Sequence, residues 1–219
     1  MSQAVVVIGG GPLSQVAIDA VRPEAVLIAA DSGLDHAVAA GLRPHVLVGD
    51  FDSISAAGRM WAYAHELEIH EHSPDKDLTD AELALRRALE VPGLRQLLVL
   101  GGLDDPDDRR PDHLLGTLLS LGHPSLADVG SVRAVLGTTQ FQMMHPGKHT
   151  VLDIEPGQLF SLLALHGPCT GITVTGARWP LADATLHGTE ARGVSNEGTE
   201  RTERTEVKVA TGVLTVVIP

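Results

Sequence analysis

The run Val-Leu-Val-Gly-Asp-Phe-Asp-Ser, residues Val46 to Ser53, decides the fold class, because an apolar segment of strand length ends directly in a glycine and two aspartates. Val46–Val48 shows no alternation of polar and apolar residues, which is typical of a strand buried on both faces of a parallel sheet. If the extended conformation continued beyond Gly49, Asp50 and Asp52 would project to the same side. The stretch therefore predicts a buried strand with two carboxylates at its carboxyl end.

Two neighbouring carboxylates repel each other, and a divalent cation relieves that repulsion. Mg²⁺ prefers oxygen ligands and often connects one or two carboxylates to the phosphates of a substrate. We therefore expect Asp50 and Asp52 to bind Mg²⁺ in an enzyme that acts on phosphates. The alternative is an Asx-type turn, which accounts for one aspartate better than for two.

Around this stretch, the first two thirds of the chain alternate short apolar runs with segments of helical periodicity. This alternation indicates βαβ units and a mainly parallel sheet. The expected strands are residues 4–8, 25–29, 45–48, 67–70, 96–100 and 133–136, and the expected helices are residues 14–21, 34–40, 56–67, 77–90 and 112–121. Ser14 and Thr79 are expected to start helices.

After about Phe141 the helical periodicity fades, and short apolar runs at residues 149–154, 159–165, 171–175, 206–210 and 213–218 alternate with turn residues. This pattern of short apolar runs separated by turn residues predicts an all-β domain. The predicted fold class is therefore α/β, with a mainly parallel, Rossmann-like catalytic domain over residues 1–140 and an all-β, sandwich-like domain over residues 141–219.

The composition narrows the possible partners. The chain has 219 residues and a formal net charge of −12, which argues against nucleic acid or an anionic membrane surface. Its apolar runs are far shorter than the roughly 18 residues of a membrane span, and the N-terminus lacks the basic segment of a signal peptide. The single cysteine, Cys169, favours a cytoplasmic location and is expected in the core rather than as a nucleophile.

Polar residues follow nearly every expected strand, at the edge where open parallel sheets bind ligands. Gly9-Gly10-Gly11 follows the first strand and either admits a phosphate or forms a tight turn. Asp31 and Ser32 follow the second strand. Residues 75–80 supply three carboxylates together with Lys76 and Thr79, so Asp80 is a candidate third metal ligand.

Residues 104–113 and Trp179 are two further candidates for a binding role. Residues 104–113 offer Arg109 or Arg110 to phosphate oxygens, although a charged loop in solvent would have the same composition. Trp179 stands in a chain with only 3% aromatic residues, so it either stacks on a heteroaromatic ring or a cation, or belongs to the core.

These pieces together resemble the thiamine pyrophosphokinase family over nearly the full length. The matching segments are Ala-Asp-Ser-Gly (30–33), Gly-Asp-Phe-Asp-Ser (49–53), Asp-Lys-Asp-Leu-Thr-Asp (75–80), Arg-Pro-Asp-His (110–113), Gly-Ala-Arg-Trp-Pro-Leu (176–181) and Gly-Val-Ser-Asn-Glu (193–197). The resemblance implies a Mg²⁺-dependent homodimer, with active sites at the subunit interface, that transfers pyrophosphate from ATP to the hydroxyl of thiamine and releases AMP.

The resemblance also implies roles for individual residues. Asp50, Asp52 and Asp80 would hold Mg²⁺ and act with Arg110 in catalysis. The ATP-binding residues would be Asp31, Ser32, Lys76, Thr79, Arg110, Asp112 and His113. Trp179 would pack against thiamine, with Ser195 and Asn196 nearby.

The chain departs from the family pattern at four positions. Asp108 and Arg109 stand where glycines are usual, Thr117 replaces an asparagine, and Gly198 replaces an apolar aromatic residue. Three alternative functions therefore stay open at this point. They are a pyrophosphokinase for another hydroxymethyl heterocycle such as a pterin, a non-catalytic sensor of thiamine diphosphate or a nucleotide, and a metal-dependent phosphohydrolase.

Overall fold

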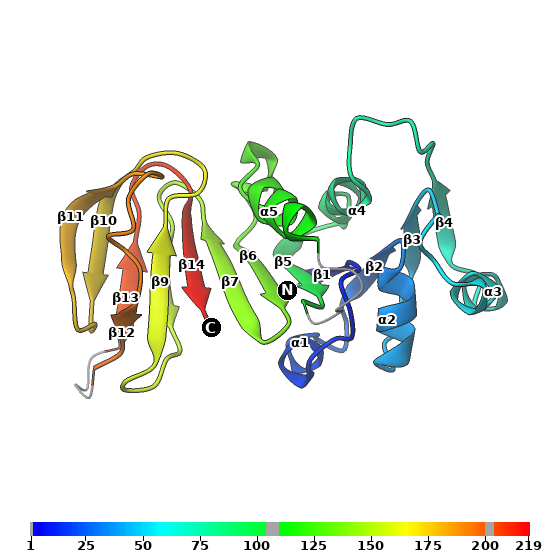
Figure 1. Ribbon diagram of the computed structural model, residues 1–219, viewed down its shortest axis with the longest axis horizontal. Helices are drawn as coiled ribbons and strands as arrows, with labels where there is room; N and C mark the ends of the chain where they lie inside the picture. The colour runs from blue at the N-terminus through cyan, green and yellow to red at the C-terminus, as the bar shows by residue number, and fades with distance from the viewer. Residues whose placement is uncertain (1, 104–109, 200–203) are drawn as a thin grey trace. The chain divides into compact units, whose positions relative to one another are not determined.

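The computed structural model describes residues 2–103, 110–199 and 204–219 (Figure 1). Its internal contacts separate two compact units. The N-terminal unit contains the chain up to Ser120 together with Arg133–Thr138, and the C-terminal unit contains Leu121–Val132 together with Thr139–Pro219. The chain thus changes unit at three places, and the division into domains after residue 140 stays a prediction.

The N-terminal unit is built on the strands β1 (Ser2–Val7), β2 (Val26–Ala30), β3 (Val46–Gly49), β4 (Glu68–Glu71), β5 (Leu94–Gly101) and β6 (Ser131–Leu136). Their order in the sheet is β6-β5-β1-β2-β3-β4, and β1 pairs in parallel with both β2 and β5. The pairs β2–β3 and β3–β4 are also parallel. The prediction of a mainly parallel α/β sheet is confirmed.

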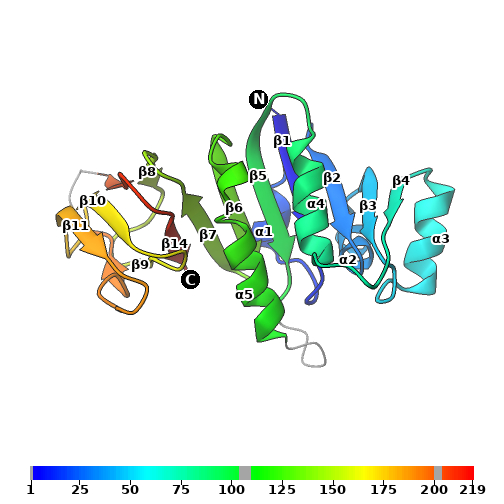
Figure 2. The same ribbon diagram turned by 90° about the horizontal axis from the view of Figure 1, so that it is seen from above.

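The helices described beside this sheet are α1 (Gln15–Asp19), α2 (Gly33–Ala39), α3 (Ala56–Ala64), α4 (Asp80–Leu89) and α5 (Pro111–Ser120). Figures 1 and 2 show α4 and α5 on one face, α1 and α2 on the other, and α3 beside β4. Because helices cover both faces, β1 and β2 are buried except for their first residues, and every residue of β3 is buried.

The helix predicted over residues 77–90 begins three residues later than expected. Thr79 is its N-cap: the Thr79 hydroxyl accepts from the Glu82 backbone N–H, and the Glu82 carboxylate accepts from the Thr79 backbone N–H. This reciprocal capping box stops the helix from extending further toward the N-terminus. Asp77 therefore lies in the preceding loop and does not share a helix face with Asp80.

The described residues of the C-terminal unit form a short 3-10 helix, η1 (Pro124–Leu126), and eight strands. The strands are β7 (Thr139–Met144), β8 (His149–Leu152), β9 (Leu159–Leu163), β10 (Cys169–Thr175), β11 (Leu181–Leu186), β12 (Asn196–Glu197), β13 (Thr205–Lys208) and β14 (Leu214–Ile218). Within this unit, β12-β9-β14-β7 are neighbours in one sheet and β11-β10-β13-β8 form another, and the pairs are antiparallel.

One core fills the space between these two sheets. Met144 and Phe160 from the first sheet pack in the same buried cluster as Ile172 and Val207 from the second. A single core shared by two antiparallel sheets is the arrangement of a β-sandwich, which confirms the predicted fold class. Cys169 belongs to this core and is fully buried, as expected. In the described ranges of the chain, no helix is long and apolar enough to cross a membrane.

His145 gives this unit a predicted pH dependence. It is 1% exposed, and burial, followed by smaller effects of Lys148 and His166, lowers its pKa below the ordinary 6.5. As the pH falls below 6.5, the unfolded chain gains a proton at this residue before the folded chain does, so the free energy of unfolding should decrease until the lower folded pKa is passed. Denaturant unfolding at a series of pH values measures this slope.

The matched control is a second histidine. His145→Gln should flatten the slope, whereas His187→Gln, at an exposed position on the same unit, should leave it unchanged. An equal slope in His145→Gln and the unmodified protein would show that the pH dependence arises elsewhere.

Candidate active site

Three carboxylates gather at the carboxyl ends of β2 and β3. One oxygen each from Asp31, Asp50 and Asp52 lies within 4.8 Å of the others. The cause is the parallel register: Ala30 pairs with Val48, so the residues that follow the two strands emerge side by side. We call these three residues the carboxylate cluster.

Asp31 was expected on the ATP side, and its place in the cluster depends on a glycine. A Cβ atom at Gly49 would lie 2.1 Å from Asp31 Oδ1, so any other residue at position 49 would displace the Asp31 carboxylate. The same Oδ1 accepts a hydrogen bond of 3.0 Å from the Phe51 backbone N–H. Asp31 thus ties the end of β2 to the turn that carries Asp50 and Asp52.

The turn itself differs from the expectation. Phe51 has a φ of +64°, in the left-handed region, so the extended conformation of β3 does not continue through the two aspartates. The carboxylates of Asp50 and Asp52 nevertheless lie close together, and the Asp52 backbone N–H donates to Asp50 Oδ1 at 3.3 Å. The turn, rather than strand alternation, brings them to one side.

The negative charge of neighbouring carboxylates affects the pKa values of the residues at the cluster. Burial, followed by repulsion from Asp80, raises the pKa of Asp31 to about 7, and Asp50 adds to the effect. Lys76 places a positive charge at the cluster: its Nζ lies 2.9 Å from Asp50 Oδ2 and 2.9 Å from Asp80 Oδ1. The hydrogen bond from Lys76 lowers the pKa of Asp50.

The neighbouring carboxylates also shift the pKa of Lys76. Burial alone would lower it, but the contacts with Asp80 and Asp50 outweigh burial and raise it. The Lys76 ammonium group thus contacts two carboxylates, those of Asp50 and Asp80. Oxygen-only ligands at this spacing fit a hard divalent cation such as Mg²⁺.

The remaining residues predicted on the ATP side lie in two places. Ser32 is close to the cluster, since its backbone N–H donates to the hydroxyl of Ser53 at 3.4 Å. The Ser32 hydroxyl oxygen would lie only 2.6 Å from a Cβ atom placed on Gly9. Thr79 uses its hydroxyl in the capping box, at 2.9 Å from Glu82 Oε2. Its predicted role toward ATP stays a prediction.

Arg110, Asp112 and His113 lie at the start of α5, where all three are exposed. Arg110 Nε and a terminal guanidinium nitrogen bond the two carboxylate oxygens of Asp112 at 3.1 and 2.8 Å, and this bond lowers the pKa of Asp112 to about 2. The guanidinium is thus already arranged for bidentate contact with an oxyanion. Residues 104–109, including Arg109, lie outside the described residues.

The residues predicted to bind thiamine lie in the C-terminal unit. Trp179 is 51% exposed, so it is not a core residue, and the Arg178 guanidinium carbon lies 4.7 Å from the centre of its ring. Asn196 is buried and clamps the Trp179 backbone: its Oδ1 accepts from the Trp179 N–H at 3.1 Å, and its Nδ2 donates to the Trp179 carbonyl at 2.8 Å.

Ser195 precedes this clamp and has a φ of +61°. Its backbone N–H donates to the Ser161 hydroxyl at 3.0 Å, while its side chain is exposed. The hydrogen bonds of Asn196 thus fix the backbone of Trp179, whose ring is exposed.

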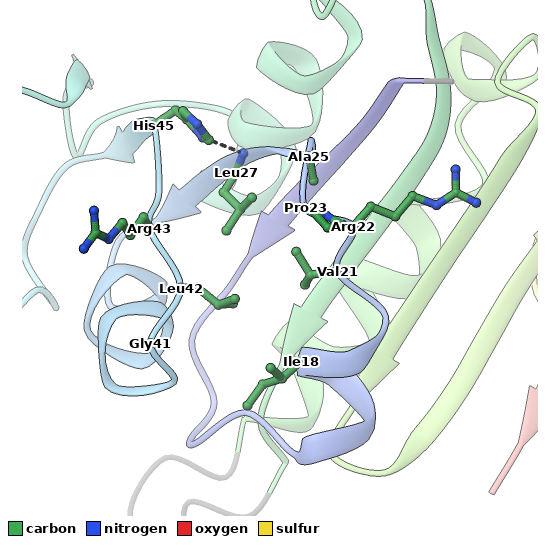
Figure 3. A pocket seen from close by; sticks show the side chains of 10 residues that line it. All are labelled: Ile18, Val21, Arg22, Pro23, Ala25, Leu27, Gly41, Leu42, Arg43 and His45. Atoms are coloured by element: carbon green, nitrogen blue, oxygen red, sulfur yellow. Dashed lines mark hydrogen bonds between the residues drawn. The ribbon is translucent and has the colours of Figure 1, made fainter.

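A cavity of about 360 Å³ lies elsewhere in the N-terminal unit, next to the residues that precede β2 and β3 (Figure 3). Ile18, Val21 and Leu42 point into it, whereas the guanidinium groups of Arg22 and Arg43 point away from it. None of the predicted site residues lines this cavity, so it is separate from the carboxylate cluster.

The sequence matches two family models. Residues 19–129 match the catalytic domain of thiamin pyrophosphokinase, and residues 148–214 match the vitamin B1 binding domain of thiamin pyrophosphokinase. The chain belongs to the thiamin pyrophosphokinase family. The catalytic-domain match contains the carboxylate cluster, and the vitamin B1 binding match contains Trp179, Ser195 and Asn196.

Known relatives agree with this assignment to the thiamin pyrophosphokinase family. The thiamine pyrophosphokinase of Bacillus subtilis is 28% identical over 172 residues, which cover 78% of this chain and 77% of that protein. A crystal structure of thiamine pyrophosphokinase from Bacillus subtilis has the same fold, with a TM-score of 0.80 at 23% identity over 100% of this chain and 98% of that chain. Thiamin pyrophosphokinase from Candida albicans gives 0.77 at 12% identity, over 99% and 89%.

Proposed function

We propose that this protein is a thiamine pyrophosphokinase, which transfers pyrophosphate from ATP to the hydroxyl of thiamine and releases AMP. The observation that carries the proposal is the carboxylate cluster at the strand ends, inside a chain that matches both the catalytic and the vitamin B1 binding domain of the family. The comparisons do not favour a pterin pyrophosphokinase, a sensor or a phosphohydrolase.

In the proposed reaction, the thiamine hydroxyl oxygen bonds to the β-phosphorus of ATP, and the bond from that phosphorus to the oxygen shared with the α-phosphorus breaks. AMP leaves with that oxygen, and the hydroxyl proton is released. The protein contributes mainly position and charge, as in other phosphoryl transfers. Mg²⁺, when bound, neutralises negative charge on the phosphates.

The residues divide this work. Asp50, Asp52 and Asp80 would hold the cation, and Asp31 would add a fourth carboxylate beside them. Lys76 fixes the orientation of Asp50 and Asp80 by contacting both at 2.9 Å. Arg110, with its partner Asp112, and His113 lie at the start of α5, where they bind the phosphates of ATP. Ser32 and Thr79 complete the ATP side.

Trp179 presents its ring to the thiazolium of thiamine, which is a cation and attracts an aromatic face. Asn196 holds the backbone of Trp179, and Ser195 lies next to it. We also propose the homodimer, with active sites at the subunit interface, that the family resemblance implies. Sedimentation of the purified protein would show whether it is a dimer.

Release of AMP tests the proposed function. The protein incubated with ATP, Mg²⁺ and thiamine should form AMP and thiamine diphosphate in equal amounts, and neither should form when thiamine or Mg²⁺ is omitted. A hydroxymethylpterin in place of thiamine should give no AMP. Release of phosphate or pyrophosphate without an acceptor would indicate a phosphohydrolase instead, and tight ligand binding with no AMP would indicate a sensor.

A further inference from the structure

Phe51 has a backbone conformation that is unusual for phenylalanine, and it lies between the two aspartates of the predicted metal site. It separates Asp50 from Asp52, it is 6% exposed, and its φ is +64°. The left-handed region is unfavourable for a residue with a Cβ atom and persists only where the surroundings hold it. The position of the two carboxylates therefore depends on whatever holds the Phe51 backbone.

Hydrogen bonds hold Phe51 on both sides. Its N–H donates to Asp31 Oδ1 at 3.0 Å, and its carbonyl accepts from a terminal guanidinium nitrogen of Arg59 at 2.6 Å. Asp31 belongs to the carboxylate cluster, but Arg59 lies on α3, outside the segments that match the family. The Arg59 contact goes to a backbone carbonyl, so it acts on the shape of the turn.

The helix turn that carries Arg59 is itself held in place by contacts with α2. The helix α3 starts after Ser55, whose backbone N–H and hydroxyl both donate to the Asp35 carboxylate, at 2.9 and 2.5 Å. Asp35 lies on α2, and a Cβ atom on Gly58 would come within 2.3 Å of its Oδ1. The start of α3 is therefore docked closely on α2, and Arg59 follows immediately after the point of contact.

We propose that Arg59 is a positioning residue for the metal site: by bonding the Phe51 carbonyl it fixes the left-handed turn that sets the two carboxylates of Asp50 and Asp52 around one divalent cation. The inference rests on the proposed function, because it takes the carboxylate cluster as the cation site. It assigns the role to a residue outside all six matching motifs.

Mn²⁺ binding in the absence of nucleotide tests this role without using activity. Arg59→Met should weaken Mn²⁺ binding, measured by isothermal titration calorimetry, by roughly tenfold, because the turn is no longer held from the carbonyl side. Arg59→Lys keeps a donor of similar reach and should recover binding to within about threefold of the unmodified protein. Arg43→Met, at an exposed arginine on the rim of the cavity in Figure 3, is the matched control and should bind Mn²⁺ normally.

Kinetics supply a second measurement. In Arg59→Met the concentration of Mg²⁺ needed for half-maximal turnover should rise by a similar factor, while the thiamine KM stays within about twofold. A lower unfolding temperature in EDTA with unchanged Mn²⁺ affinity would overturn the inference and leave Arg59 a purely structural residue. An equal loss in Arg59→Lys and Arg59→Met would also contradict it.

Asp50→Asn separates this inference from the proposed function. If Asp50→Asn loses Mn²⁺ binding while Arg59→Met binds as the unmodified protein does, the cation site is correct and the role of Arg59 is wrong. If Asp50→Asn binds Mn²⁺ normally, the cation site is wrong, and the inference about Arg59 falls with it.

Discussion

Asp50→Asn is expected to lower kcat for thiamine diphosphate formation by about two to three orders of magnitude while the fold stays intact, which corresponds to about 3–4 kcal/mol of lost transition-state stabilisation. Asparagine has nearly the same size as aspartate and still accepts the bond from the Asp52 backbone N–H. The charge that faces Lys76 and the proposed cation is lost. Lys76 keeps Asp80 as a partner at 2.9 Å, so the loop is not left with an isolated charge.

The measurement is steady-state kinetics of AMP release at saturating Mg²⁺, combined with thermal unfolding. Asp128→Asn makes the same chemical change at an exposed position in the C-terminal unit and should leave kcat unchanged. Turnover of Asp50→Asn within about tenfold of the unmodified protein would exclude the proposed metal role of this carboxylate.

The general position of this site could be predicted from the sequence because it follows from strand geometry. Apolar runs that lack alternation indicate a parallel sheet, and parallel strands end at a common edge. Asp31 and Asp50 each follow such a run, and the pairing of Ala30 with Val48 brings them together. The same reasoning could have placed Asp31 in the metal cluster, since β2 and β3 are consecutive in the chain.

The conformation of the turn could not be predicted in this way. Strand alternation predicted that Asp50 and Asp52 share a side through an extended Phe51, but Phe51 is left-handed. The residue type gives no warning, because left-handed backbone is expected at glycine or asparagine rather than at phenylalanine. The stabilising partner, Arg59, lies eight positions away on a helix and contacts a backbone atom, which has no signature in the sequence.

Thr79 and Asn196 show how one residue can satisfy a motif and a structural requirement at once. Thr79 lies in a segment that matches the family, and its hydroxyl completes a capping box. Asn196 lies in another matching segment, and its amide binds both backbone polar groups of Trp179. Because Asn196 is buried, the structure supports an indirect role through Trp179, which a motif cannot distinguish from direct contact with thiamine.

Trp179→Ala is expected to raise the thiamine KM by roughly five- to thirtyfold, as loss of about 1–2 kcal/mol of ring and cation–π contact would do. The substitution is informative because it removes only the ring. Both hydrogen bonds with Asn196 involve backbone atoms of residue 179, the N–H as donor and the carbonyl as acceptor, so they persist in the variant. The side chain is 51% exposed, so its removal leaves no large cavity in the core.

Three measurements together identify the role of the ring. The ATP KM should stay within about twofold and the unfolding temperature should be nearly unchanged, because the binding energy lost is specific to the thiazolium. Tyr63→Ala, which removes a 65% exposed aromatic ring from α3, should leave the thiamine KM unaffected. A drop in unfolding temperature with an unaltered thiamine KM in Trp179→Ala would show that the ring supports the sandwich, and thiamine would then have to bind through other residues of the C-terminal unit.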